Sequence, residues 1–202
     1  MSHVTGTKPG IGRLLIWIGI GILAATLYGI LNDQITVTIA PEYFSVFKRM
    51  QFAPILEQTG LQEAPTRVQA ILVGTMATWW FGLFLGIVLS FSGLVGRRPP
   101  LSTRDFLRAV VGIMVFTLGL SILWGAIAYL AEPQIKPDSD HWPFLYRIQA
   151  IRPAFAIGFW HDGAYLGGFI GTIGASLWAQ YRRRKAKIFI KSNPVDTSAT
   201  TG

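Results

Sequence analysis

Residues 109–130 read AVVGIMVFTLGLSILWGAIAYL and carry no charge over 22 positions. A helix needs about 20 mostly apolar residues to cross a bilayer. Residues 14–31 and 68–96 are uncharged over 18 and 29 positions, and residues 157–181 are interrupted only by one His-Asp pair. In lipid the backbone must satisfy its own hydrogen bonds, and these runs are too continuous for barrel strands. The sequence therefore predicts an all-α membrane protein, a bundle of four transmembrane helices.

The composition is typical of a membrane protein. Hydrophobic residues make up 51% of the 202 positions and charged residues 14%, where a soluble domain has about a quarter charged residues. The chain contains no cysteine, which excludes disulfides, thiolate metal sites and cysteine nucleophiles. Its length suits one domain or one small membrane bundle.

The net charge of +8 follows the expected topology. Twelve Lys and Arg residues flank the start of the first span, the 97–108 connection and the end of the last span, against two acids. The other six lie in the two remaining loops, 32–67 and 131–156, together with seven acids. Because basic residues collect on the cytoplasmic side, both termini are predicted to be cytoplasmic, in the bacterial inner (plasma) membrane. The basic excess is then a topology signal and gives no indication of nucleic-acid binding.

The first apolar run has the charged start of a signal peptide, with Lys8 and Arg13 ahead of it. Its 18 residues exceed the usual apolar region of about 7–15 residues, and no small-residue cleavage site follows. We therefore expect a retained membrane anchor.

Small residues recur at every fourth position of the last span. In lipid, such residues let two helix backbones approach closely. Packing inside the bundle is favoured, because the chain already supplies three partner helices, and the alternative is a homo-oligomer or a membrane-complex partner. The predicted helix-packing interface consists of Gly163, Gly167, Gly171, Ala175 and Ala179.

The first outer loop, residues 32–67, is too long for a simple turn. Residues 35–39 alternate branched apolar and hydroxyl side chains, which predicts a strand. Pro41 and Glu42 favour the start of a short amphipathic helix that lies on the outer leaflet or caps the bundle. We expect an outer-loop partner surface on this segment, made of Tyr43, Phe44, Phe47, Lys48 and Arg49.

The second outer loop contains Asp138, Asp140 and His141, whose side chains are of types that bind metals. Three residues without a fourth clustered ligand favour a solvated loop, and we expect no metal and no other cofactor. Residues 143–160 are expected to form an interfacial helix, and residues 192–202 a disordered cytoplasmic tail.

The first loop opens with Asp33-Gln34-x-Thr, followed by Pro41-Glu42-Tyr43-Phe44, and the last span carries His161 ahead of Tyr-Leu-Gly-Gly. This DQ-x-T…PEYF arrangement resembles a pattern in uncharacterised bacterial four-span integral membrane proteins. The resemblance covers the first loop and the last span. It implies a membrane location and brings no activity with it.

His161 and Asp162 interrupt the last apolar stretch. Ionisable residues in a span are candidates for function, because an unpaired charge in lipid is costly. His161 is therefore the candidate cofactor-binding residue, whether it relays protons, ligates a metal or holds a tetrapyrrole. A cap or packing role is favoured, with Asp162 as the cap of a helix that starts at Gly163.

No catalytic motif is recognisable, neither G-x-S-x-G nor H-E-x-x-H nor a P-loop. The sequence thus favours a structural or partner-binding subunit over an enzyme. The alternatives are a small channel or transporter, and a cofactor-binding membrane protein that uses His161. A channel shows polar residues on one helical face at several depths, and Thr75, Thr78, Thr117 and Ser121 do not make that pattern by themselves.

Overall fold

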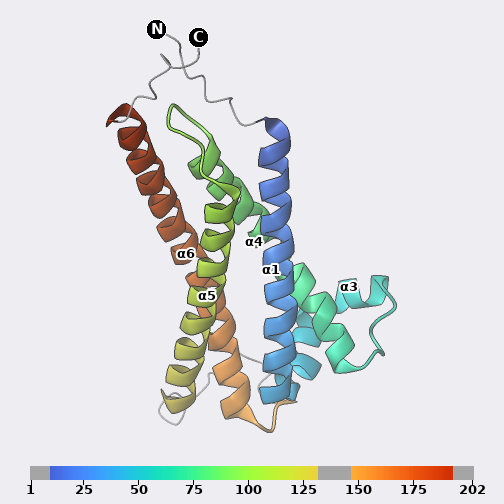
Figure 1. Cartoon of the computed structure of the whole chain (residues 1–202). Coiled ribbons are helices and arrows are strands. Elements are labelled where there is room, and N and C mark those ends of the chain that lie inside the picture. The colour runs from blue at the N-terminus through green and yellow to red at the C-terminus, as the bar shows by residue number, and fades with distance from the viewer. Residues whose placement is uncertain (1–9, 132–146, 193–202) are drawn as a thin grey trace, which may run out of the picture.

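The computed structural model describes residues 10–131 and 147–192, with side chains up to residue 188. Within these ranges every regular element is helical (Figure 1). Three helices are long and apolar enough to cross a membrane, namely α1 (Ile11–Ile39), α4 (Thr66–Leu94) and α5 (Thr103–Ala131). The predicted all-α membrane fold is confirmed to that extent. The expectations for Asp138, Asp140, His141 and the C-terminal tail fall outside the described residues, apart from residue 192 at the end of the last helix.

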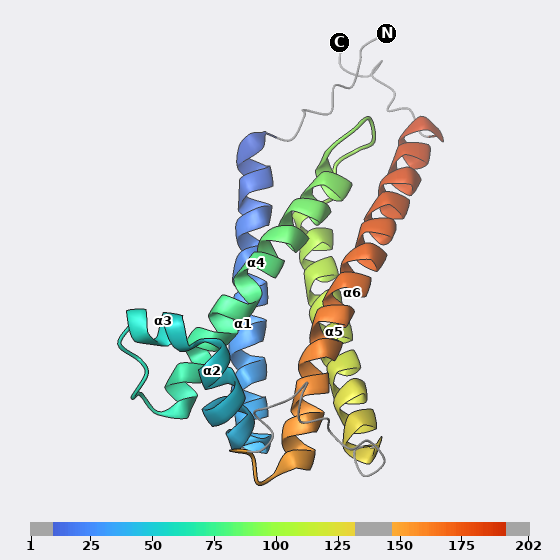
Figure 2. The same cartoon turned by 180° about the vertical axis from the view of Figure 1, so that it is seen from behind.

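The fourth long helix, α6 (Ile151–Ser192), has 42 residues but is less apolar. Glycine, alanine and polar side chains occupy much of its length. It runs alongside α5 for most of the bundle (Figures 1 and 2). Small residues therefore give close packing at the expense of hydropathy.

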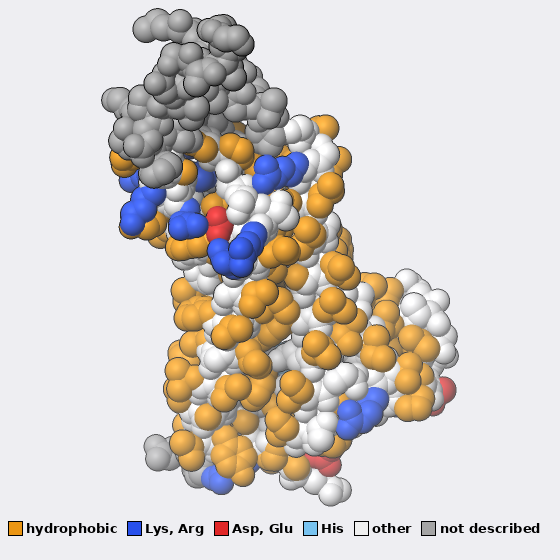
Figure 3. All heavy atoms as spheres, in the orientation of Figure 1, with side chains coloured by type: hydrophobic (Ala, Val, Ile, Leu, Met, Phe, Trp, Pro, Cys, Tyr) orange, Lys and Arg blue, Asp and Glu red, His pale blue; other side chains and the backbone are white. Residues whose placement is uncertain are grey.

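The long helices pack as two antiparallel pairs, α1 with α4 and α5 with α6 (Figure 2). Contact between the pairs is much sparser and is made chiefly by α4 and α6. Figure 3 shows hydrophobic side chains over the middle of one face, with Lys and Arg gathered toward the end that carries the α4–α5 connection. This end is called the α4–α5 end below, and the other the short-helix end.

The α1–α4 pair is held by glycine backbones in contact. A Cβ atom added to Gly21 would lie 2.7 Å from the carbonyl oxygen of Gly82 and 2.8 Å from the Cα of Gly86. A Cβ added to Gly74 would lie 2.7 Å from the carbonyl oxygen of Gly29. Such short distances leave room for hydrogen only, so these positions set how closely the two helices approach.

The glycines of the predicted packing interface face α5. An added Cβ would lie 2.9 Å from the Leu120 carbonyl oxygen at Gly163, and 2.9 Å from the Thr117 Cα at Gly167. Gly171 contacts α5 one turn further along. The structure thus uses this row within the chain. Ala179 is buried in the core near the α4–α5 end, and Ala175 packs against that core.

Residues 35–39 are helical, so the strand prediction for this segment is wrong. The hydroxyls of Thr36 and Thr38 donate to the carbonyl oxygens of Asn32 and Gln34, one turn earlier, at 2.9 Å each. These bonds satisfy the hydroxyls inside a helix, and the packing of the segment overrides its β propensity. The predicted loop 32–67 therefore begins only after Ile39.

Three short helical elements follow, η1 (Tyr43–Lys48), α2 (Arg49–Gln51) and α3 (Ala53–Gln58), beside the short-helix end of the bundle (Figure 2). They agree with the amphipathic helix predicted after Pro41. η1 is a π-helix, a wide turn often found at functional sites. Its Tyr43 and Phe44 are 3% and 2% exposed and point into the bundle.

Asp162 lies inside α6, which begins at Ile151, so the prediction that it caps the last span is wrong. The carboxylate of another residue accepts hydrogen bonds at the start of α6. Oε2 of Glu42 accepts the backbone N–H groups of Gln149 and Ala150 at 2.9 and 2.8 Å. A negative charge there complements the positive end of the helix dipole, and the contact also ties the segment before η1 to α6.

Arg183, 2% exposed, secures the α4–α5 end. Its guanidinium donates to the carbonyl oxygens of Ser92, Val95, Arg98 and Pro99 at 2.7–3.0 Å. Carbonyls at the end of a helix lack partners within it, and this side chain supplies them. One of the basic residues that follow the last span is therefore internal.

We expect Gly21→Ala to lower the free energy of unfolding by about 2 kcal/mol, because the added methyl meets backbone atoms that have no rotamer to change. Gly19→Ala is the matched control, since a Cβ at Gly19 has no atom within 4 Å. Denaturation in mixed micelles measures the free energy of unfolding of both variants. Equal stability of the two variants would show that the glycine contact does not limit the approach of α1 and α4.

Candidate functional site

A buried ion pair joins the two helix pairs at the short-helix end. Nε2 of His161, on α6, lies 3.0 Å from Oδ1 of Asp33, on α1. The side chains are 13% and 4% exposed, respectively. Asp162, the sequence neighbour of the histidine, is exposed. Successive helical residues point about 100° apart, so only one member of the predicted His161-Asp162 pair enters the site.

The hydrogen bonds of His161 define where protons lie. Nδ1 is 2.8 Å from the carbonyl oxygen of Ile157, which only accepts, so Nδ1 carries a proton. If the carboxyl of Asp33 is ionised, Nε2 also carries a proton and donates it. If that carboxyl is protonated, it donates to Nε2. In both states one hydrogen bond joins Nε2 and Oδ1.

Aromatic side chains close the site from the short-helix end. The Tyr43 ring stacks on the His161 imidazole with centroids 5.4 Å apart, and the Phe44 ring lies 6.1 Å away. Beside them, the Trp160 indole N–H donates to Oδ1 of Asn32 at 2.7 Å. The adjacent positions Asn32 and Asp33 on α1 thus bind the adjacent positions Trp160 and His161 on α6.

Lys48 is 7% exposed, and its Nζ donates to Oε1 of Gln51 at 3.1 Å. The ammonium also lies 5.7 Å from the centroid of the Tyr43 ring. Burial lowers the pKa of Lys48 below its ordinary value of 10.5, and the carboxylates of Asp33 and Asp162 oppose that change. Burial, followed by the charges of the same two carboxylates, raises the pKa of the Tyr43 phenol.

The segment expected to form a partner surface is largely internal. Tyr43, Phe44 and Lys48 are buried, Phe47 is half-buried against the same cluster, and only Arg49 is exposed. The apolar face of this short helix covers the histidine and the bundle. We therefore correct the assignment of Tyr43, Phe44 and Lys48 from a partner surface to the lining of the site.

A cavity of about 60 Å³ lies between the helix pairs and extends from the Asp33–His161 pair toward the middle of the bundle. All four long helices line it, and most of its wall is apolar. Tyr28, Thr78, Thr117 and Tyr165 place hydroxyls around it. A volume of this size holds a few water molecules, which need about 10–15 Å³ each.

One face of α6 carries polar side chains at intervals from His161 to Arg183. The first of these side chains is His161. Further along, the Tyr165 hydroxyl donates to the Ala77 carbonyl oxygen of α4 at 3.1 Å, and the Gln180 amide donates to the Ser92 carbonyl oxygen of α4 at 2.9 Å. Between them come buried Thr172 and the buried hydroxyl of Ser176. Spacings of three, four and seven residues keep these side chains on one face of a helix. This polar stripe of α6 comprises His161, Tyr165, Thr172, Ser176, Gln180 and Arg183.

Three hydroxyls in the bundle are buried without a hydrogen-bond partner among the described residues, those of Ser90, Thr117 and Ser176. Thr117 borders the cavity. A buried hydroxyl without a partner is costly, and ordered water usually satisfies it. These hydroxyls belong to α4, α5 and, for Ser176, the polar stripe of α6, and all three are available for further hydrogen bonds.

Both ring nitrogens of His161 are engaged by protein atoms, so neither is free to ligate a metal or a tetrapyrrole iron in this arrangement. Within the described residues, no group of three or more His, Cys, Asp and Glu side chains is placed to hold a metal ion.

Comparison of the chain with protein-family models, with curated proteins and with solved structures found no match. The fold and the site therefore define the class of protein: a helical membrane protein with a buried Asp–His pair. Sequence reasoning named His161 but missed its partner Asp33, which it placed in a loop. The signal was available in the resemblance pattern, where Asp33, Tyr43 and the last-span histidine occur together.

We expect Asp33→Ala and His161→Ala to be strongly destabilising alone and much less than additive together. Removal of one partner leaves the other buried and unpaired, and a charge-assisted hydrogen bond contributes about 2 kcal/mol. A double-mutant cycle on unfolding in micelles measures the coupling. Asp162→Ala in place of Asp33→Ala is the comparison and should show weaker coupling to His161, because Asp162 acts on the imidazole through its charge and makes no hydrogen bond to it. Additive effects of the first two variants would contradict the pair.

We expect Lys48→Met to remove a pH dependence of stability. Because the pKa of Lys48 is lower when folded, the unfolded chain binds more protons below 10.5, and stability rises with pH through that window. Unfolding measured from neutral pH to about pH 9.5 stays below the range in which Tyr43 ionises. In Lys48→Met the stability should no longer rise with pH, whereas in Arg49→Met it should still rise. An unchanged profile in Lys48→Met would refute the assignment.

Proposed function

We propose that this chain is a four-span protein of the bacterial inner membrane, of the channel or transporter class, that carries protons along the polar stripe of α6. The observation that carries the proposal is the buried Asp33–His161 pair at one end of that stripe. A hydrogen bond of 3.0 Å joins the two side chains, and a cavity of water-accommodating size lies next to them. Intramembrane ionisable groups of this kind mark proton pathways.

The helix arrangement supports four spans. α6 packs along α5, which is apolar enough to cross a membrane, so the two cross together. Both the start of α1 and the end of α6 lie at the α4–α5 end (Figure 1). Arg13, Arg98 and Arg183 lie at that end as well, which favours a cytoplasmic location for both termini. Asp33 is 20 residues from Arg13 along α1, or about 30 Å, near the outer boundary of the hydrocarbon.

The polar stripe of α6 supplies what the sequence lacked as support for a channel, namely polar groups at several depths on one face. Its members face the weakly packed contact between the helix pairs, and the glycine face of the same helix binds α5. Tyr28, whose hydroxyl lies 3.4 Å from that of Ser121, adds an oxygen from α1. Water molecules between these hydroxyls would complete a hydrogen-bonded chain.

The roles favoured by the sequence are less well supported. A partner-binding subunit rested on an outer-loop surface that is now mostly internal. A cofactor role rested on His161, whose ring nitrogens are both engaged. The proposed kinship with bacterial membrane proteins gains a rationale, because the residues that carry the DQ-x-T…PEYF resemblance meet at the ion pair.

The test is proton flux into liposomes that enclose a pH-sensitive dye, driven by a potassium diffusion potential. We expect vesicles that contain the wild-type protein to take up protons faster than protein-free vesicles. Asp33→Asn removes the titratable carboxyl, and Thr117→Val removes a hydroxyl at the cavity without changing its volume. Both should reduce the flux to nearly that of protein-free vesicles.

Asp162→Asn and Thr75→Val are the matched controls, because Asp162 is exposed and Thr75 lies outside the cavity wall on α4. Both should conduct like the wild type. A wild-type flux equal to that of protein-free vesicles would exclude this function and return the partner-binding role to first place. Flux that survives Thr117→Val but not Asp33→Asn would place the proton path away from the cavity.

A further inference from the structure

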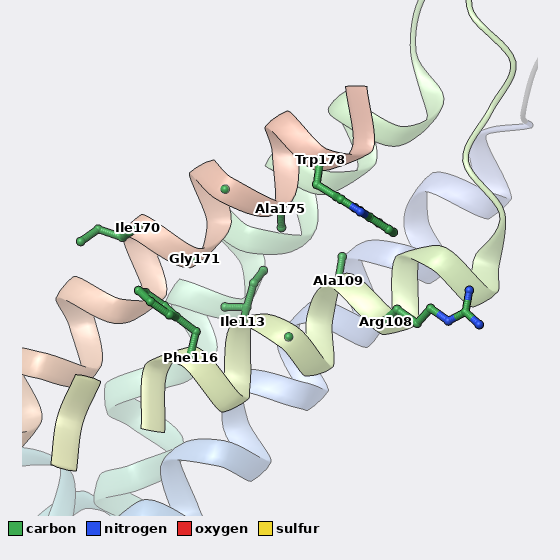
Figure 4. A pocket seen from close by; sticks show the side chains of 10 residues that line it. Arg108, Ala109, Ile113, Phe116, Ile170, Gly171, Ala175 and Trp178 are labelled. Carbon is green, nitrogen blue, oxygen red and sulfur yellow. The ribbon is translucent and has the colours of Figure 1, made fainter. Parts of the chain in front are cut away.

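A second hollow lies on the outside of the bundle, between α5 and α6. It is an open groove of about 390 Å³, and its wall is almost wholly apolar. Figure 4 shows Phe116 and Ile170 at one end and Trp178 and Arg108 at the other. The groove is separate from the internal cavity and is not used by the proposed proton path.

Missing side chains produce the groove. A Cβ atom added to Gly112 or to Gly174 has no atom within 4 Å, so both glycines open directly onto empty space. Exposed apolar side chains border them, with Phe116 at 45% and Ile170 at 46% exposure. A hollow with such a border on a membrane-facing surface is filled by hydrocarbon, because no water is present in the bilayer core.

A cationic cluster lies at the Arg108 end of the groove. Asp105 accepts from Arg108 at 3.0 Å and from Arg182 at 3.4 Å, so two guanidinium groups share one carboxylate and a positive charge remains. The Arg182 guanidinium also lies 5.8 Å from the centroid of the Trp178 ring, which borders the groove. A Trp beside Arg at the edge of the hydrocarbon is typical of the membrane interface.

A polar hollow of about 400 Å³ continues from this cluster at the α4–α5 end. Asp105 and Arg182 belong to its wall, together with Ser102 and Lys185. The apolar groove and the polar hollow are therefore neighbours, because Arg108 borders the first and its ion-pair partner Asp105 borders the second. An acyl chain matches the first, and an anionic headgroup matches the second.

We infer that the groove holds one acyl chain of an anionic phospholipid of the cytoplasmic leaflet, with its phosphate beside the Arg108–Asp105–Arg182 cluster, whose net charge is positive. The inference rests on the membrane orientation proposed above and is independent of proton conduction. A second copy of the chain fits this face poorly. A two-fold interface parallel to the membrane normal would bring Arg108 and Arg182 against their own copies, whereas a lipid phosphate supplies the missing negative charge.

The test is native mass spectrometry of the protein in detergent with equal amounts of phosphatidylglycerol and phosphatidylcholine. We expect preferential retention of phosphatidylglycerol. Arg108→Gln should lower that preference about fivefold, the effect of one cation near an anionic lipid. The double substitution of Gly112→Leu and Gly174→Leu fills the groove and should abolish retention of either lipid.

Gly119→Leu and Arg104→Gln are the controls. A Cβ at Gly119 also meets nothing within 4 Å, and Arg104 is exposed, but neither borders the two hollows. Both variants should retain lipid like the wild type. Equal retention of the two lipids, loss of the preference in Arg104→Gln, or displacement of the lipid by soluble glycerophosphate would each overturn the inference. Conversion of a dimer into a monomer by the groove-filling variant would instead identify a second copy as the occupant.

Discussion

Contact between helix backbones at glycine organises this bundle. Gly21, Gly82 and Gly86 bring α1 onto α4, and Gly163 and Gly167 bring α6 onto α5. Lipid provides no hydrophobic force between helices, so close van der Waals contact must supply the attraction. Two rigid pairs result, and the boundary between them packs less closely. Polar groups and a cavity can be accommodated at that boundary because the pairs do not depend on it for cohesion.

Because of this arrangement, two faces of α6 make different contacts. One face carries the glycines that bind α5, and another carries the polar stripe that faces α4 and α1. Side-chain contacts hold the two helix pairs together at the two ends of their boundary. Asp33 and Asn32 bind His161 and Trp160 at the short-helix end, and Arg183 binds four carbonyls at the α4–α5 end. Between these ends lies the cavity, next to the hydrogen bond of Asp33 and His161.

The errors of sequence reasoning have a common physical origin. Hydropathy ends the first span at the first charged residue, Asp33, so residues 32–39 were assigned to a loop although α1 continues through them. The same criterion made Asp162 a cap, whereas Glu42, distant in sequence, serves the start of α6. The aromatic residues of η1 predicted an amphipathic helix correctly, but no local pattern shows which surface such a helix covers. The first of these errors hid Asp33, whose partner His161 lies on another helix.

The sequence by itself determined the helical class, three apolar helices of membrane-spanning length, the asymmetry of basic residues and the small-residue row of α6. These properties depend on composition and on periodicity within one segment, and lipid gives a backbone few alternatives to a helix. Only the tertiary structure decided that His161 meets Asp33 and that Tyr43 covers them. It also decided that the glycine row turns the polar stripe toward α4. Such pairings depend on the rotation and depth of one helix relative to another, which are set by packing between segments far apart in the chain.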